Sequence, residues 1–164
     1  MPTLRDATTA DAAAIAAIYN HEILHSTSTF DTTPVDADDR RAWLEAHSTP
    51  QRSVLVLEDE EVVGWASLSA WSDRCAYARA AEVSIYIHAD HRGRGHGRSL
   101  LTGLIERARE AGIAVLLARI CTEGEASIVL HRKLGFSSVG CMRRVGEKFG
   151  RVLDVELMDL SLEA

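Results

Sequence analysis

The chain has 164 residues, of which 46% are hydrophobic and 26% charged, and its formal net charge is −6 at pH 7. This length is typical of one domain with its own hydrophobic core, so we expect residues 1–164 to form a single domain. Non-specific nucleic-acid binding needs a net cationic surface, and an acidic chain therefore argues against nucleic acid as a partner.

The first half of the chain alternates helical and strand patterns. The spacing of apolar residues predicts a short strand over 3–5, a helix from Thr9 to about Leu24 and, after a loop rich in Ser and Thr, a second helix that begins at Asp36 or Asp38. Residues 53–58 and 62–69 predict a β-hairpin. An irregular segment over 71–80 leads into a strand over 81–88, in which polar and apolar residues alternate.

The second half begins with a basic, glycine-rich loop over 90–99. A helix with apolar residues at helical spacing follows this loop and ends near Gly112. We then expect a buried strand over 113–120, a helix over 125–134, a strand from Phe136 to about Val145, a turn over 146–150 and a last strand over 151–160. This pattern predicts a mixed α/β fold, with a mixed central sheet flanked by helices.

The N-terminus and the cysteines indicate a compartment. The first twenty residues carry acids where a signal peptide has bases, and no window approaches the ~20 apolar residues of a membrane span. Cys75, Cys121 and Cys141 are far apart and form no C-x-x-C pair, which argues against a disulfide framework and a zinc site. The histidines have no metal-ligand spacing either. We therefore expect a cytoplasmic protein without a membrane segment or a metal.

A strand, a glycine-rich loop and a helix follow one another directly in AEVSIYIHADHRGRGHGRSLLTGL. Glycines at 93, 95 and 97 permit positive φ angles and a close approach of the backbone to a ligand. The free N–H groups and the dipole of the helix favour an anion at its start, and Arg92, Arg94 and Arg98 add positive charge. The pattern indicates a phosphate or pyrophosphate site, with a glycine-rich turn and solvated arginines as the alternative.

Known phosphate-binding motifs narrow this interpretation. No Lys follows the glycines as in a Walker A loop, and the spacing does not fit a dinucleotide fingerprint. The segment RGRGHG over 92–97 does fit [RQ]-x-x-G-x-[GA], and LHRKLGF over 130–136 and the order of elements fit the same family. The chain thus resembles the GNAT superfamily of acetyl-CoA-dependent N-acetyltransferases. The resemblance implies the GNAT acyl-CoA N-acyltransferase fold, with acetyl-CoA as co-substrate.

Within that superfamily, the chain resembles the phosphinothricin and methionine sulfone (or sulfoximine) acetyltransferases. The resemblance rests on Tyr19-Asn20-His21, Thr29-Phe30, the strand at 81–87, and Lys148-Phe149-Gly150-Arg151. It implies acetyl transfer to the amino group of a small amino-acid-like acceptor by direct attack in a ternary complex. It also implies a homodimer.

The resemblance assigns acetyl-CoA contacts to the strand, the glycine-rich loop and one helix. The expected cofactor-binding residues are Ile85, Tyr86, Ile87, Arg92, Gly93, Arg94, Gly95, His96, Gly97, Arg98 and Ser127. Two positions depart from the family. Relatives usually have Asn in place of Gly124, where it contacts the CoA arm, and they often have Trp in place of Val152.

Two residues are expected to transfer protons. The resemblance makes Glu82 the general base, acting through water on an amine whose pKa lies above neutrality. His131 occupies the position where many members carry a Tyr that protonates the leaving thiolate, and an unperturbed His with a pKa near 6.5 suits that task. The alternatives are a solvent-facing Glu at position 82 and a packed or surface His at position 131.

Four residues are expected to contact the acceptor: Phe30, Arg74, Tyr77 and Lys148. The resemblance places the segment around Arg74 and Tyr77 beside the acceptor. An Arg suits a carboxylate, phosphinate or sulfone oxygen because its planar fork donates two hydrogen bonds. The segment over 72–79 holds two arginines and one acid, which favours an anionic acceptor over a polyamine, although a plain surface Arg remains the alternative.

Two further functions stay open from the sequence. The same fold acetylates other amines in the superfamily, such as a protein N-terminus, an aminoglycoside or a polyamine. The second alternative is not an enzyme but a non-catalytic module that binds acyl-CoA. This alternative stays open because Gly124 stands where relatives usually have Asn.

Overall fold

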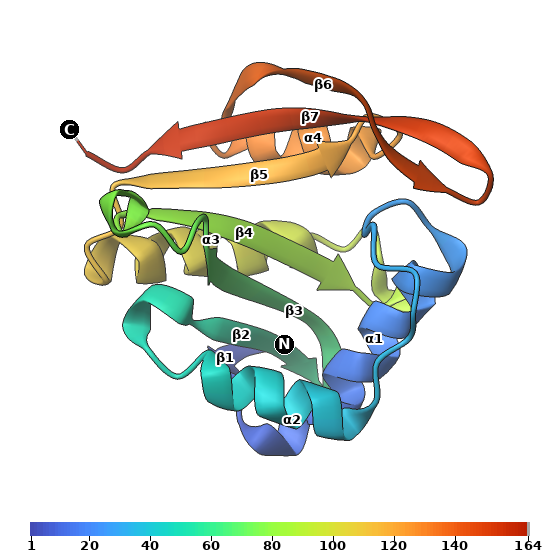
Figure 1. Ribbon diagram of the computed structural model, residues 1–164. Helices are drawn as coiled ribbons and strands as arrows, with labels where there is room; N and C mark the ends of the chain where they lie inside the picture. Colours follow the sequence, from blue (N-terminus) through green and yellow to red (C-terminus); the bar gives the residue numbers. More distant parts are fainter. Residues whose placement is uncertain (164) are drawn as a thin grey trace.

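A seven-stranded sheet forms the centre of the computed structural model, in which residues 1–163 are described (Figure 1). The strands are β1 (Thr3–Asp6), β2 (Val54–Asp59), β3 (Glu61–Ala70), β4 (Ala80–Ile87), β5 (Val115–Cys121), β6 (Ser137–Lys148) and β7 (Arg151–Ser161), and the helices are α1 (Ala12–His25), α2 (Ala37–Ala46), α3 (His96–Glu110) and α4 (Glu125–Lys133). The sheet order is β1-β2-β3-β4-β5-β7-β6. The predicted mixed α/β fold with a mixed, helix-flanked sheet is confirmed.

Helices cover both faces of the sheet and create two apolar cores (Figure 1). On one face, Ile15 and Ile18 of α1 and Leu44 of α2 pack against Trp65 of β3. On the other face, the apolar side of α3 packs on β2–β5, and Phe136 and Met158 extend this core toward β7. Burial of apolar surface on two sides fixes the sheet between the helix layers. The helices α1 and α2 leave the matching face of β5–β7 uncovered (Figure 1).

The middle of the sheet opens between β4 and β5. All other neighbouring strands are antiparallel, whereas β4 and β5 run parallel and pair only from Ala80–Val115 to Glu82–Leu117. Beyond this point the two strands diverge, which leaves the last five residues of β4 unpaired on that side (Figure 1). Backbone groups of Val83–Ile87 therefore face a gap instead of a neighbouring strand.

Several element ends differ from the sequence prediction. The strand β6 continues to Lys148, so the expected turn over 146–150 was wrong and only Phe149 and Gly150 separate β6 from β7. A register shift between Met142 and Gly146 absorbs the extra residues, and Arg144 takes a positive φ of 58° there. The helix α3 begins at His96, inside the segment that was expected to be loop.

The N-terminal helix also begins later than expected. Thr9–Asp11 form a 3₁₀ turn and α1 starts at Ala12. Among residues 1–163, no helix is both long and apolar enough to cross a membrane, and no group of three or more His, Cys, Asp and Glu side chains is placed to bind a metal. The three cysteines are free thiols, of which only Cys121 is buried.

Candidate active site

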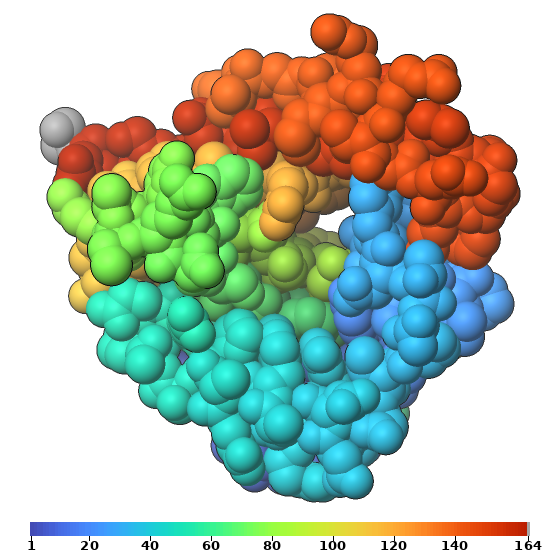
Figure 2. Space-filling model, in the orientation of Figure 1, coloured from blue at the N-terminus to red at the C-terminus, as the bar shows by residue number. Residues whose placement is uncertain are grey.

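A cavity of about 960 Å³ lies where β4 and β5 separate. It is lined by β4, the glycine-rich loop, β5, α4 and the loop between α1 and α2. Figure 2 shows a hollow between the blue α1–α2 loop and the orange and red strands β6 and β7. A ligand in this cavity can reach the unpaired edge of β4 and the start of α3 at once.

The glycine-rich loop presents free backbone donors to one end of the cavity. Gly93 and Gly95 have φ angles of 74° and 82°, and a Cβ at either position would meet nothing within 4 Å. The first intrahelical bond of α3 runs from Ser99 N to Gly95 O at 3.2 Å, so the preceding N–H groups have no intrahelical partner. The buried Nε2 of His96 has no partner among the described residues. These features fit an anionic, hydrogen-bonding ligand.

Arg92 joins the glycine-rich loop to α1. Its guanidinium donates to the carboxylate of Glu22 and, at 3.4 Å, to Ile87 O. The Glu22 side chain is only 4% exposed and also accepts a hydrogen bond of 2.7 Å from Ser28 Oγ. A buried acid on an apolar helix face costs free energy unless it is paired, so this ion pair fixes the loop against α1. Sequence reasoning missed Glu22, although its place on the apolar face of α1 was a signal.

Glu82 and Arg119 form a bidentate ion pair at the point where the β4–β5 ladder ends. Arg119 Nε and Nη2 donate to the two carboxylate oxygens of Glu82, each at 2.6 Å. The Glu82 side chain is 18% exposed and that of Arg119 is 53% exposed. The hydrogen bonds to Glu82 raise the pKa of Arg119. The Arg119 guanidinium also lies 5.2 Å from the centre of the Trp71 ring.

His131 is buried on α4 and borders the cavity. Its Nδ1 lies 2.7 Å from Ser127 O, and because a carbonyl can only accept, Nδ1 carries the proton. Burial lowers the pKa of His131. The imidazole is therefore neutral at pH 7, with a lone pair and no proton at Nε2, which does not suit the expected role of acid toward a thiolate.

Tyrosines close the end of the cavity nearest α1. The Tyr19 hydroxyl donates to Asp31 and lies 2.9 Å from Thr29 Oγ1. Burial raises the pKa of Tyr19 to about 12, and burial also raises the pKa of Tyr86. The two rings meet edge to face with centroids 5.1 Å apart. Both phenols therefore stay protonated in the physiological range, and both line the cavity at this end.

Comparison with known proteins identifies the family. The family model described as an acetyltransferase (GNAT) domain matches residues 4–157. The chain belongs to the GNAT acetyltransferase family. It is 44% identical over 162 residues to the L-amino acid N-acyltransferase MnaT of Escherichia coli, with 98% of this chain and 94% of that protein covered.

Two further comparisons, one with a sequence and one with a solved structure, also match nearly the whole chain to acetyltransferases. The L-methionine sulfoximine/L-methionine sulfone acetyltransferase of Salmonella typhimurium is 44% identical over 98% of this chain and 95% of its own length. The structure of yncA from Salmonella typhimurium with its cofactor acetyl-CoA superposes with a TM-score of 0.97 and 42% identity, covering 100% of this chain and 95% of that one. The predicted family, GNAT fold and subfamily resemblance are confirmed.

Most residues predicted to hold acetyl-CoA line the cavity of this GNAT chain. They are Ile85, Tyr86, Ile87, Arg92, Gly93, Gly95, His96, Gly97 and Ser127. Arg94 and Arg98 are exposed and do not line it, and Arg94 donates instead to Asp90 O at 3.2 Å. Gly124 caps α4, and a Cβ at this position would lie 3.1 Å from Cys121 O, so an Asn here would need the backbone to shift by a few tenths of an ångström.

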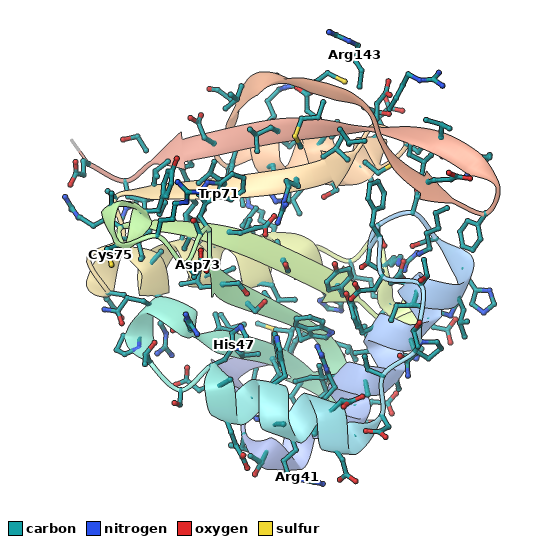
Figure 3. The ribbon with its side chains drawn as sticks, in the orientation of Figure 1. Arg41, His47, Trp71, Asp73, Cys75 and Arg143 are labelled. Atoms are coloured by element: carbon teal, nitrogen blue, oxygen red, sulfur yellow. The ribbon has the colours of Figure 1, made fainter. Side chains whose placement is uncertain are left out.

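Of the four predicted acceptor residues, Phe30 lines the cavity. Its ring packs over Gly146, where a Cβ would lie 2.2 Å from Phe30 Cε2. Arg74 and Tyr77 are exposed at the 3₁₀ turn over 75–77 and do not line the cavity. Figure 3 marks this segment with the labels Trp71, Asp73 and Cys75, beside the start of β4.

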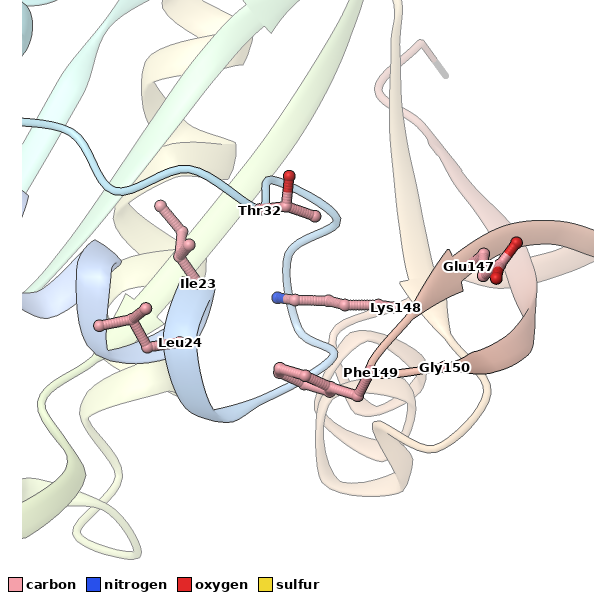
Figure 4. A pocket seen from close by; sticks show the side chains of 7 residues that line it. All are labelled: Ile23, Leu24, Thr32, Glu147, Lys148, Phe149 and Gly150. Carbon is pink, nitrogen blue, oxygen red and sulfur yellow. The ribbon is translucent and has the colours of Figure 1, made fainter.

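Lys148 is buried, and its ammonium group is held by backbone carbonyls. It donates to Glu22 O, Ser26 O and Thr29 O at 3.3, 2.7 and 2.8 Å. Figure 4 shows the side chain reaching from β6 toward the loop that carries Thr32, beside a smaller hollow. This geometry favours a structural role, in which Lys148 anchors the α1–α2 loop to β6, over the expected contact with an acceptor.

The lowered pKa of His131 predicts a pH-dependent stability. In the unfolded chain a His takes up a proton near pH 6.5, whereas His131 in the folded protein does so only at a lower pH. The contribution of His131 to the free energy of unfolding is therefore full above pH 6.5 and decreases as the pH falls toward its folded pKa. Thermal unfolding between pH 7.5 and 5 is expected to show a decrease in Tm that is smaller in His131→Gln. Equal decreases of Tm in both proteins would contradict a lowered pKa of His131. Burial also lowers the pKa of His47, but His47 is present in both proteins and its effect cancels in the comparison.

Proposed function

We propose that the protein transfers the acetyl group of acetyl-CoA to the α-amine of a small amino acid of the methionine sulfone, methionine sulfoximine or phosphinothricin type. The observation that carries the proposal is that Glu82 and the anion-binding start of α3 open into one cavity. The names of the relatives support this class of acceptor. The reaction requires both reactants to be bound together, and one continuous cavity permits it.

The residues around the cavity fit acetyl-CoA. The loop Gly93–Gly97 and the N–H groups at the start of α3 would hold the pyrophosphate, and His96 Nε2 offers a further polar contact. The unpaired backbone of Val83–Ile87 would hold the pantetheine as an added strand would. When bound, acetyl-CoA supplies an activated acetyl group, whose carbonyl carbon gains a bond to the amine nitrogen as its bond to sulfur breaks.

The proton of the acceptor ammonium would pass to Glu82, directly or through one water, before the amine attacks. Glu82 is bound to Arg119 alone among the described residues, so its carboxylate can exchange partners without breaking a larger network. The thiolate needs a proton in turn. As the amide forms, the nitrogen loses a second proton, and this is the proton that the thiolate takes up. Because His131 donates its Nδ1 proton to Ser127 O and is neutral, we assign this transfer from nitrogen to sulfur to water in the cavity.

A thiol-release assay tests the proposed function. The purified protein with acetyl-CoA is offered methionine sulfone, methionine sulfoximine, phosphinothricin, a peptide N-terminus, an aminoglycoside and a polyamine. We expect turnover with the first three and little with the others. Turnover with only one of the last three would identify a different acceptor, and tight acetyl-CoA binding without any turnover would favour the non-catalytic acyl-CoA-binding module.

We also propose that the protein is a cytoplasmic homodimer. The twelve residues of β6 form an edge strand that is almost entirely exposed, and with the following turn and β7 it presents Val139, Val145, Phe149 and Val152 at 50–57% exposure. An exposed apolar edge of this kind favours association, and three free thiols suit a reducing compartment. Sedimentation equilibrium should give twice the 17.9 kDa chain mass. A single-chain mass at micromolar concentration would contradict the dimer.

A further inference from the structure

The position of Arg119 favours a second role besides its ion pair with Glu82. Arg119 lies on β5, two residues after Leu117, which pairs with Glu82 at the end of the β4–β5 ladder. Its side chain extends back across the opening to the Glu82 carboxylate. Half of the side chain is exposed, and the guanidinium lies over the Trp71 ring. The group is thus held in a fixed orientation with its donors directed into the cavity at the predicted general base.

The charges around the cavity leave one cation for an anionic acceptor. Among the described residues that line it, only Arg92 and Arg119 are arginines, and lysine is absent. Arg92 is paired with the buried Glu22 and belongs to the pyrophosphate end. Arg74, which the sequence suggested for this task, does not line the cavity. Arg119 is therefore the cation that an acceptor beside Glu82 would meet.

We propose that Arg119 binds the α-carboxylate of the acceptor while Glu82 receives its ammonium group. This inference rests on the proposed function and names what in the chain selects an α-amino acid. In the free protein the two side chains neutralise each other, and a zwitterion inserted between them replaces one ion pair by two. A guanidinium presents two parallel donors to a carboxylate, a geometry that an α-carboxylate fits.

The exchange of ion pairs also explains why the site would select an α-amino acid over an amine without a carboxylate. A plain amine that pairs with Glu82 would separate it from Arg119 and leave the guanidinium without an anion in a partly desolvated site, which is unfavourable. A site built around a charged partner therefore rejects an analogue that lacks it more strongly than it would reject one missing a methyl group. We expect the wild-type protein to prefer methionine sulfone over its decarboxylated counterpart, which keeps the sulfone and the amine.

The experiment compares these two acceptors in the wild type and in Arg119→Gln. For methionine sulfone, kcat/KM should fall by about 10–100-fold, mostly through KM, because a charge-assisted hydrogen-bonded pair is lost. For the decarboxylated amine, kcat/KM should change by less than about threefold or rise, since no carboxylate contact is lost. Arg119→Lys keeps the charge without the fork and should fall between the two. The exposed Arg109→Gln on α3 is the matched control and should behave as the wild type.

Calorimetry provides a second measurement that does not need turnover. With coenzyme A present, methionine sulfone should bind the wild type more tightly than Arg119→Gln, while both bind acetyl-CoA equally. Equal losses on both acceptors, or equal binding of methionine sulfone to wild type and variant, would overturn the inference while leaving the acetyltransferase intact. Binding that depends on Arg119 without turnover of any amine would instead overturn the proposed function alone.

Discussion

Replacing Glu82 by Gln is expected to lower kcat at neutral pH by about 10²–10⁴-fold, the usual contribution of general base catalysis. Gln has the shape of Glu and its amide oxygen can still accept from Arg119, so the fold and the acceptor site should survive. The rate of the variant should rise with pH, because a higher pH supplies the free amine without help from a base. Measuring kcat from pH 6.5 to 9.5 in both proteins tests this.

The exposed acid Glu110 at the end of α3 provides the matched control for this substitution. Glu110→Gln removes the same charge far from the cavity and should retain the wild-type pH profile. A Glu82→Gln protein with unchanged rates at both ends of the pH range would show that Glu82 is not the base. A uniform loss at all pH values, with no recovery, would assign it to positioning of the acceptor instead.

Local patterns in the sequence predicted the strand and the loop at the centre of the site. Alternation along β4 correctly placed Val83 in the apolar core and Glu82 on the opposite face, although both border the cavity where β4 loses its neighbouring strand. The three glycines and the following apolar period predicted a glycine-rich loop that leads into a helix, although α3 begins at His96, earlier than expected. These features depend on neighbours within a few residues, so a single sequence contains the necessary information.

The same reasoning did not predict contacts between segments that lie far apart in the sequence. Arg119 reaches Glu82 because β5 pairs in parallel with β4, a register that no local pattern specifies. Lys148 binds carbonyls of α1 and of the loop that follows it, more than a hundred residues earlier, and its sequence neighbours do not reveal this. The tertiary fold decides whether a charged side chain serves a ligand or the protein itself, and this is why the expected roles of Arg74, Lys148 and His131 found less support than those of the glycine-rich loop.

A substitution of Gly95 by Ala is expected to weaken acetyl-CoA binding by about 10–100-fold, which corresponds to the loss of charge-assisted backbone hydrogen bonds. Gly95 has a φ of 82° at the N-cap of α3. An L-residue in the left-handed region costs roughly 1–2 kcal/mol, and a loop that relaxes to avoid this strain turns its N–H groups away from the pyrophosphate. Calorimetric titration with acetyl-CoA measures the effect.

The other end of α3 offers a control with the same backbone strain. Gly112 has a φ of 77°, and a Cβ there would also meet nothing within 4 Å. Gly112→Ala should therefore lower Tm by an amount similar to Gly95→Ala, about 2–8 °C for a domain of this size, while acetyl-CoA affinity stays at the wild-type level. Equal losses of affinity in both variants would mean that strain along α3, and not the donors at its N-terminus, controls binding. Full affinity in Gly95→Ala would place the pyrophosphate elsewhere in the cavity.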